Sequence, residues 1–104
     1  MPRDVWFVIP PDLVLLDFAG AAEAFRLAAQ GGAPLRLRYA ATAAGVANTS
    51  LGIGLTGFGA LPATLAADDV VIVCGARGET GQPDAERRVR NAYGRCGVAQ
   101  PQRP

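Results

Sequence analysis

Few side chains in this sequence have the chemistry that catalysis needs. The candidates are the carboxylate of Asp17 and the thiols of Cys74 and Cys96. A carboxylate next to a cysteine can exchange a proton with a thiolate or with a bound substrate. The chain has no histidine, the commonest general base and metal ligand. A Ser-His-Asp or Cys-His device therefore cannot be assembled from this chain alone, and we expect no metal site and no cofactor.

Each candidate also has a purely structural interpretation. Asp17 stands at the start of a predicted helix, where its carboxylate could simply cap the backbone N–H groups; both roles could coexist in a complete domain. Cys74 ends an apolar run and is followed by a polar loop, not by a helix. We therefore expect a buried, unreactive thiol. Cys96 has no apolar strand before it.

The elements that would position these side chains follow from the apolar pattern. Val5–Ile9 and Val70–Cys74 are continuous apolar runs rich in β-branched residues, which predicts neighbouring parallel strands buried on both faces. A helix is predicted from about Asp17 to Gln30, with an apolar face formed by Phe18, Ala22 and Phe25. Alternation of this kind predicts an α/β fold, a three-layer sandwich with a mostly parallel, flavodoxin-like sheet.

The remaining segments carry weaker patterns. Strict alternation over Leu35–Tyr39 predicts a strand with one covered face. The residues from Gly45 to Gly57 predict a turn near Asn48 and then a glycine-softened strand through Leu51, Ile53 and Leu55. Leu61–Ala66 predicts a short helix.

The character of the sequence changes after Gly75. A polar loop precedes a helix that Pro83 opens, and no regular structure is predicted from Gly94 onwards. We therefore divide the chain into residues 1–76, which form the α/β unit, and residues 77–104, which form a loop, a short helix and a poorly ordered tail.

Three stretches together resemble one family. The stretch Leu15–Phe25 resembles the motif L-L-D-x-x-G-P-x-E-x-F, Thr49–Gly52 resembles a T-S-x-G turn, and Asp69–Ala76 resembles a strand that ends in a Pro-Gly-Gly loop. These motifs are typical of the ThiJ/PfpI (glutamine-amidotransferase-like) domains found in AraC-type transcriptional regulators and isonitrile hydratases. Ala21 replaces the proline of the first motif, and Cys74 and Ala76 replace two residues of the Pro-Gly-Gly loop.

The resemblance assigns roles to four residues. Asp17 takes the position of the family's acid, which lies beside the nucleophilic cysteine in hydratase-like members. Gly20 lies where helix and pocket meet, although tight helix–sheet packing is an equal alternative. Gly75 and Ala76 lie where the family supplies a backbone N–H to an oxyanion hole. Asp17, Gly20, Gly75 and Ala76 are therefore the pocket candidates.

The family's nucleophile elbow and its helix-turn-helix repeats are absent from this sequence. The resemblance thus implies an incomplete domain, truncated before both. We expect a non-catalytic sensor or dimerisation domain of an AraC-type regulator. The alternatives are a fragment of an isonitrile-hydratase-like enzyme and a shortened product without a biochemical role. Possible partners are a small-molecule ligand and a second copy of the chain, because truncation would leave a central strand as an exposed edge.

Charge and the first residues of the chain narrow the choice of partners and compartment. A formal net charge of +1 favours neither nucleic acid nor membrane. A small basic cluster is interpreted as a solvated helix face; it consists of Arg87, Arg88, Arg90 and Arg95. The first apolar run is interrupted at Pro10, which fits neither a signal peptide nor a membrane span. With two cysteines and no sign of secretion, we expect a cytoplasmic protein.

Overall fold

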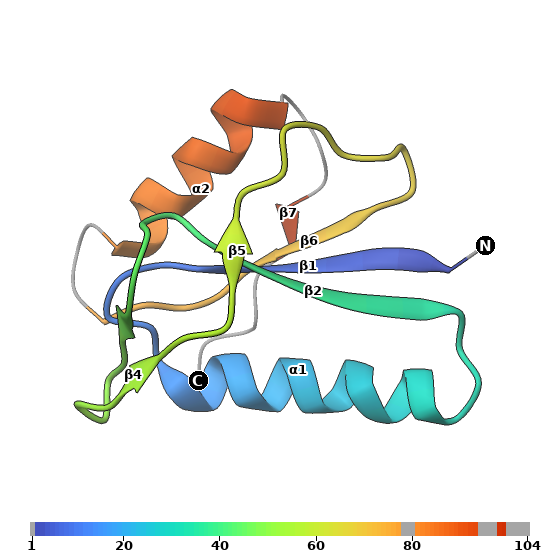
Figure 1. Cartoon of the computed structure of the whole chain (residues 1–104), viewed down its shortest axis with the longest axis horizontal. Helices are drawn as coiled ribbons and strands as arrows, with labels where there is room; N and C mark the ends of the chain where they lie inside the picture. Colours follow the sequence, from blue (N-terminus) through green and yellow to red (C-terminus); the bar gives the residue numbers. More distant parts are fainter. Residues whose placement is uncertain (1, 78–80, 94–97, 100–104) are drawn as a thin grey trace.

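A parallel β-sheet lies between two helices in the computed structural model, which describes residues 2–77, 81–93 and 98–99 (Figure 1). The sheet has the strand order β5-β2-β1-β6-β7, and all its pairings are parallel. Its strands are β1 (Arg3–Ile9), β2 (Leu35–Ala41), β5 (Gly59–Ala60), β6 (Val70–Val73) and β7 (Val98–Ala99). The helices α1 (Leu15–Gln30) and α2 (Gly81–Tyr93) cover opposite faces. This three-layer α/β arrangement confirms the predicted fold class.

The central strand β1 contributes to a core on each side of the sheet. Its residues from Val5 to Val8 pair in parallel with β6, as predicted. Val5 and Phe7 belong to the core beneath α1, whereas Val8 belongs to the core beneath α2. Both faces of β1 are therefore withdrawn from water over Val5–Ile9, which explains why that part of its sequence is apolar without interruption.

The helix α1 packs through the apolar face that the sequence predicts. Ala22 is buried, and Phe18 and Phe25 pack against the same core. The ring of Phe7 meets both phenylalanines edge-on, with centroids 6.0 and 5.9 Å away. On the opposite face, Ala85 of α2 is buried in the second core. Residues beyond 76 therefore share a core with β1 and β6.

Two predictions for the segment between β2 and β6 are wrong. The strands β3 (Ala47–Asn48) and β4 (Gly54–Leu55) form an antiparallel hairpin. Leu51 and Ile53 lie in its turn and are exposed, because Thr49 closes that turn with hydrogen bonds to the Ile53 carbonyl.

The second correction concerns residues 61–66, which are not helical. Pro62 has no N–H to donate, and its carbonyl accepts a hydrogen bond from the hydroxyl of Tyr93 on α2. Leu61 and Leu65 pack on the core beneath α2 instead. Contacts with distant parts of the chain thus override the local helical pattern.

The expectations for the end of the chain also need correction. Val98 and Ala99 form β7 and pair with β6, where no strand was predicted. The strand β6 therefore has a neighbour on each side, and its residues Val71, Ile72 and Val73 are buried. None of the helices within the described residues is long and apolar enough to cross a membrane.

Candidate functional site

Loops from three parts of the sequence meet at the carboxyl ends of β1 and β6. The loop after β1 contacts the β3–β4 hairpin through Leu13, whose N–H donates to the Asn48 carbonyl over 3.2 Å. The N–H of Ser50 donates to the Leu13 carbonyl over 2.8 Å. These bonds join the loop just before the first motif segment to the hairpin that contains the second, although the two are far apart in the sequence.

The loop after β6 contacts the other side of the β1 loop. The N–H of Val14 donates to the Gly75 carbonyl over 2.9 Å, and the N–H of Arg77 donates to the Asp12 carbonyl over 2.8 Å. The chain leaves β1 and β6 toward opposite faces of the sheet, since α1 and α2 cover different cores. In open α/β sheets, ligands bind in the crevice at such a topological switch point.

The start of α1 is held by the hairpin and not by Asp17. The helix begins at Leu15 with Val14 as its N-cap residue, and no side chain of its own caps it. The Oγ atom of Ser50 accepts a hydrogen bond from the Leu15 N–H over 3.2 Å. The interpretation of Asp17 as an N-cap is therefore wrong, because the helix starts two residues earlier. Asp17 lies in the first turn, where the helix dipole favours its negative charge.

The Asp17 carboxylate lies against the backbone of Gly75. A Cβ atom added at Gly75 would lie 2.5 Å from Asp17 Oδ2, so a larger residue there would force the carboxylate to move. Asp17 is partly buried, and among the described residues its carboxylate has no hydrogen-bond or ion-pair partner. Its oxygens are thus able to accept hydrogen bonds from a ligand at the switch point.

The thiol of Cys74 is fully buried beside this site, as predicted. Burial raises the pKa of Cys74 to about 12, and the negative charge of Asp17 acts in the same direction. The thiol therefore stays protonated at neutral pH, where a nucleophilic cysteine needs a lowered pKa.

The other two pocket candidates differ in their surroundings. Ala76 is buried and faces Leu13 across an isolated antiparallel bridge, so it belongs to the converging loops. Gly20 is exposed, and a Cβ added there would meet nothing within 4 Å. The alternative of tight helix–sheet packing at Gly20 is therefore wrong. A role of Gly20 in ligand binding stays a prediction.

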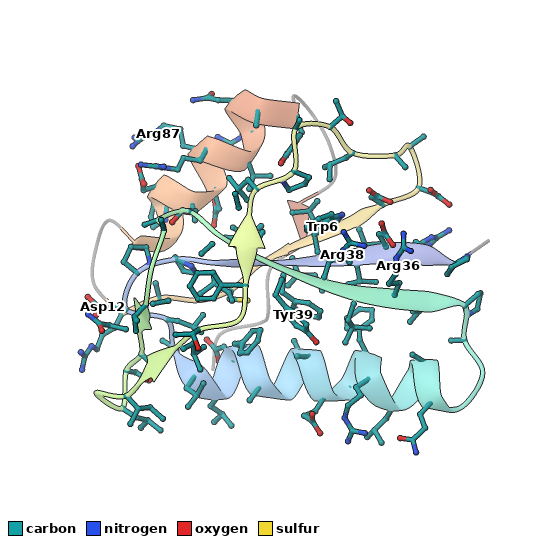
Figure 2. The ribbon with its side chains drawn as sticks, viewed as in Figure 1. Trp6, Asp12, Arg36, Arg38, Tyr39 and Arg87 are labelled. Carbon is teal, nitrogen blue, oxygen red and sulfur yellow. The ribbon has the colours of Figure 1, made fainter. Side chains whose placement is uncertain are left out.

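Small hollows lie beside the converging loops. One of about 170 Å³ is lined in part by Asp12, Thr42 and Asn48. Asp12 has a positive φ of 55°, and Figure 2 shows it at the end of the sheet where the loops meet. A more apolar groove of about 260 Å³ is lined in part by Phe18 and Tyr39. Figure 2 shows Tyr39 between the sheet and α1.

Reasoning from the sequence missed the structural roles of Ser50 and Asp12. The T-S-x-G motif contained the signal for Ser50, but its link to the start of α1 depends on tertiary contacts. Arg87 and Arg88 form ion pairs with Asp84 on α2, whereas Arg95 and Cys96 lie outside the described residues. In the described part of the chain, no three metal-ligating side chains are grouped to hold an ion.

Comparison with known proteins supplies a structural likeness. No protein-family model matches the chain, and no curated protein matches it. Among solved structures, an AraC family transcriptional regulator from Pseudomonas putida is similar, with a TM-score of 0.66 and 20% sequence identity. The match covers 86% of this chain and 57% of that regulator chain. At this level of identity the likeness shows a shared fold.

Proposed function

We propose that this chain is a ligand-sensing and dimerisation domain of the ThiJ/PfpI-like kind, belonging to an AraC-type transcriptional regulator, and that it has no catalytic activity of its own. The observation that carries the proposal is the Asp17 carboxylate, which lies partly buried against Gly75 without a partner among the described residues. The shared fold with an AraC family regulator supports the class of protein.

The chemistry of the site favours a small polar ligand. A carboxylate accepts hydrogen bonds and attracts positive charge, so the ligand carries an amine, amide or hydroxyl group. Leu13 and Ala76 are buried apolar neighbours in the same loops.

The buried, protonated thiol of Cys74 supports a domain that binds a ligand without catalysis. A thiol with a pKa of about 12 carries almost no thiolate at neutral pH, and its full burial blocks access. The chain supplies no histidine as a general base. The Asp17 carboxylate can therefore bind a ligand, but the protonated thiol of Cys74 beside it is not a nucleophile that it could assist.

A thermal-shift screen with small amines, amides and alcohols tests ligand sensing. A compound that binds the folded state raises Tm by mass action. We expect at least one such compound to raise the Tm of the wild type, and Asp17→Asn to abolish the increase. Asp68→Asn removes an exposed carboxylate and serves as the matched control. Compounds that stabilise the wild type and Asp17→Asn equally would show that Asp17 is not the binding group.

An isonitrile hydration assay tests the absence of catalysis. We expect no turnover above the uncatalysed rate, because neither an ionised thiol nor a histidine base is present at the site. Turnover by the wild type that Asp17→Ala abolishes would contradict the proposal and would favour the hydratase-like alternative.

A further inference from the structure

The outer edge of β2 is open along most of its length. Every residue of β2 pairs with β1, whereas β5 pairs only with Ala40 and Ala41 at the carboxyl-terminal end. No strand among the described residues pairs with the other side of residues 35–39, called the open edge below. Figure 1 looks onto this edge, with β5 in front of one end of β2.

Backbone groups of the open edge point away from the sheet. The N–H of Thr42 donates to the Ile9 carbonyl over 3.3 Å, so residue 42 bonds toward β1. In a parallel pair alternate residues bond to the same neighbour. Leu37 and Tyr39 are out of step with residue 42, and their N–H and C=O groups are therefore directed outwards. A row of such groups is a template for another extended strand.

The two faces beside the open edge differ in chemistry. Arg36 and Arg38 lie on the face that carries Trp6 (Figure 2). Tyr39 lies on the face of α1, where a groove of about 260 Å³ is lined in part by Phe18 and Tyr39. Side chains of an added strand would alternate between these faces. One set would thus meet arginines, and the other set would meet the apolar groove.

Arg38 is the cation of the open edge that is left for a partner. The Arg36 guanidinium already donates two hydrogen bonds to the Asp4 carboxylate, over 2.6 and 3.1 Å. The Arg38 guanidinium has no ion pair or hydrogen bond within the described residues, and it lies 5.0 Å from the centroid of the Trp6 ring. The ring attracts this cation, while its N–H groups remain able to donate to a carboxylate. The charge therefore favours an acidic partner.

The same arginines disfavour a second copy of the chain on this edge. If two open edges paired antiparallel, with the sheet continuing from one copy into the other, Arg36 and Arg38 of one copy would lie opposite those of the other. Like charges directly opposite each other destabilise a strand pair. A strand with acidic residues at alternate positions meets no such repulsion.

We propose that the open edge of β2 binds an extended segment of another protein in which acidic and apolar residues alternate. Main-chain hydrogen bonds to Leu37 and Tyr39 hold the segment as an added strand, and the alternate side chains supply specificity. An acidic side chain pairs with Arg38, and an apolar side chain enters the groove beside Tyr39. The surface goes beyond the proposed function and does not use the Asp17 carboxylate.

Fluorescence anisotropy of a labelled synthetic peptide, Val-Glu-Phe-Glu-Val, with the full 104-residue chain tests the inference. We expect saturable binding, and binding at least about tenfold weaker for the peptide with lysine at both acidic positions. Two further peptides carry N-methyl groups on one or the other alternate set of amides. Only the set that faces β2 donates hydrogen bonds, so one of these peptides should bind and the other should not.

A charge reversal identifies the residue that selects the acidic peptide. Arg38→Glu should raise Kd for the glutamate peptide at least about tenfold and should lower Kd for the lysine peptide. Arg90→Glu makes the same change of charge at an exposed position of α2 and should leave both values unchanged. Circular dichroism verifies that each variant folds.

Several outcomes would overturn the inference. They are the absence of saturable binding, equal binding of the glutamate and lysine peptides, and equal binding of the two N-methylated peptides. Equal effects of Arg38→Glu and Arg90→Glu would overturn it too, because net charge alone would then explain the binding. The N-methylated peptides are measured on the wild type, so this arm holds even if a variant does not fold. Small-molecule binding that depends on Asp17 succeeds or fails independently.

Discussion

The contact between Asp17 and Gly75 shows how a residue without a side chain shapes the candidate site. A Cβ at position 75 would collide with the Asp17 carboxylate where it now lies, so glycine here lets the carboxylate approach the backbone without moving. The carboxylate in turn acts on Cys74, because a negative charge opposes ionisation of the thiol. Both effects are local, and both can be measured on single variants.

Asp17→Asn should lower the pKa of Cys74. Removal of the negative charge favours the thiolate, while burial, the larger cause, keeps the pKa above its ordinary value of 9.0. The pKa is measured from thiolate absorbance in a Cys96→Ser background, so that one thiol titrates. A pKa that stays the same or rises in Asp17→Asn would show that the carboxylate does not act on the thiol.

Cys74 should also make the protein less stable at alkaline pH. Its pKa is raised on folding, so its contribution to stability is complete below the unfolded value of 9.0 and is lost as pH rises toward about 12. Between these values the free energy of unfolding should fall by about 1.4 kcal/mol per pH unit more in the wild type than in Cys74→Ala. Chemical denaturation of both proteins at several alkaline pH values measures the difference. Parallel pH profiles would contradict the assignment.

At the scale of elements, apolar composition predicts some parts of the fold and tertiary contacts decide others. The strands β1 and β6 and the core face of α1 follow from the sequence because each buries the side chains that its pattern presents. The start of α1 could not be predicted, since Ser50 from a distant hairpin caps it. The alternation of Leu51 and Ile53 with glycines suggested a strand. The turn that Thr49 closes with its bonds to the Ile53 carbonyl exposes both side chains instead.

The start of α1 should be weakened when Ser50 loses its hydroxyl. Ser50→Ala leaves the Leu15 N–H without this acceptor and should lower the free energy of unfolding by about 1 kcal/mol. Ser50→Thr keeps a hydroxyl and serves as the control. Urea denaturation followed by the fluorescence of Trp6, the single tryptophan, measures the change. Equal stability of the wild type and Ser50→Ala would mean that the bond contributes nothing.

At the scale of the whole molecule, the site arises from the topology. The chain leaves β1 and β6 toward opposite faces, and the loops that follow them are joined to each other and to the β3–β4 hairpin by backbone hydrogen bonds. The sequence motifs identify Asp17, Gly75 and Ala76 as candidates, but they do not show which of these residues lie next to one another. The structure brings these three together with Leu13 and Ser50, and it leaves Gly20 on the surface.

The location of ligand binding tests this account most directly. Two-dimensional ¹H–¹⁵N NMR spectra of the labelled chain would be recorded with the small amine, amide or alcohol that raises Tm most. We predict that the largest shift changes fall on the amides of Leu15, Ser50, Gly75 and Ala76, and that Asp17→Asn removes them. Shift changes confined to the groove of Phe18 and Tyr39, or unchanged in Asp17→Asn, would contradict a sensor site at the carboxyl ends of β1 and β6.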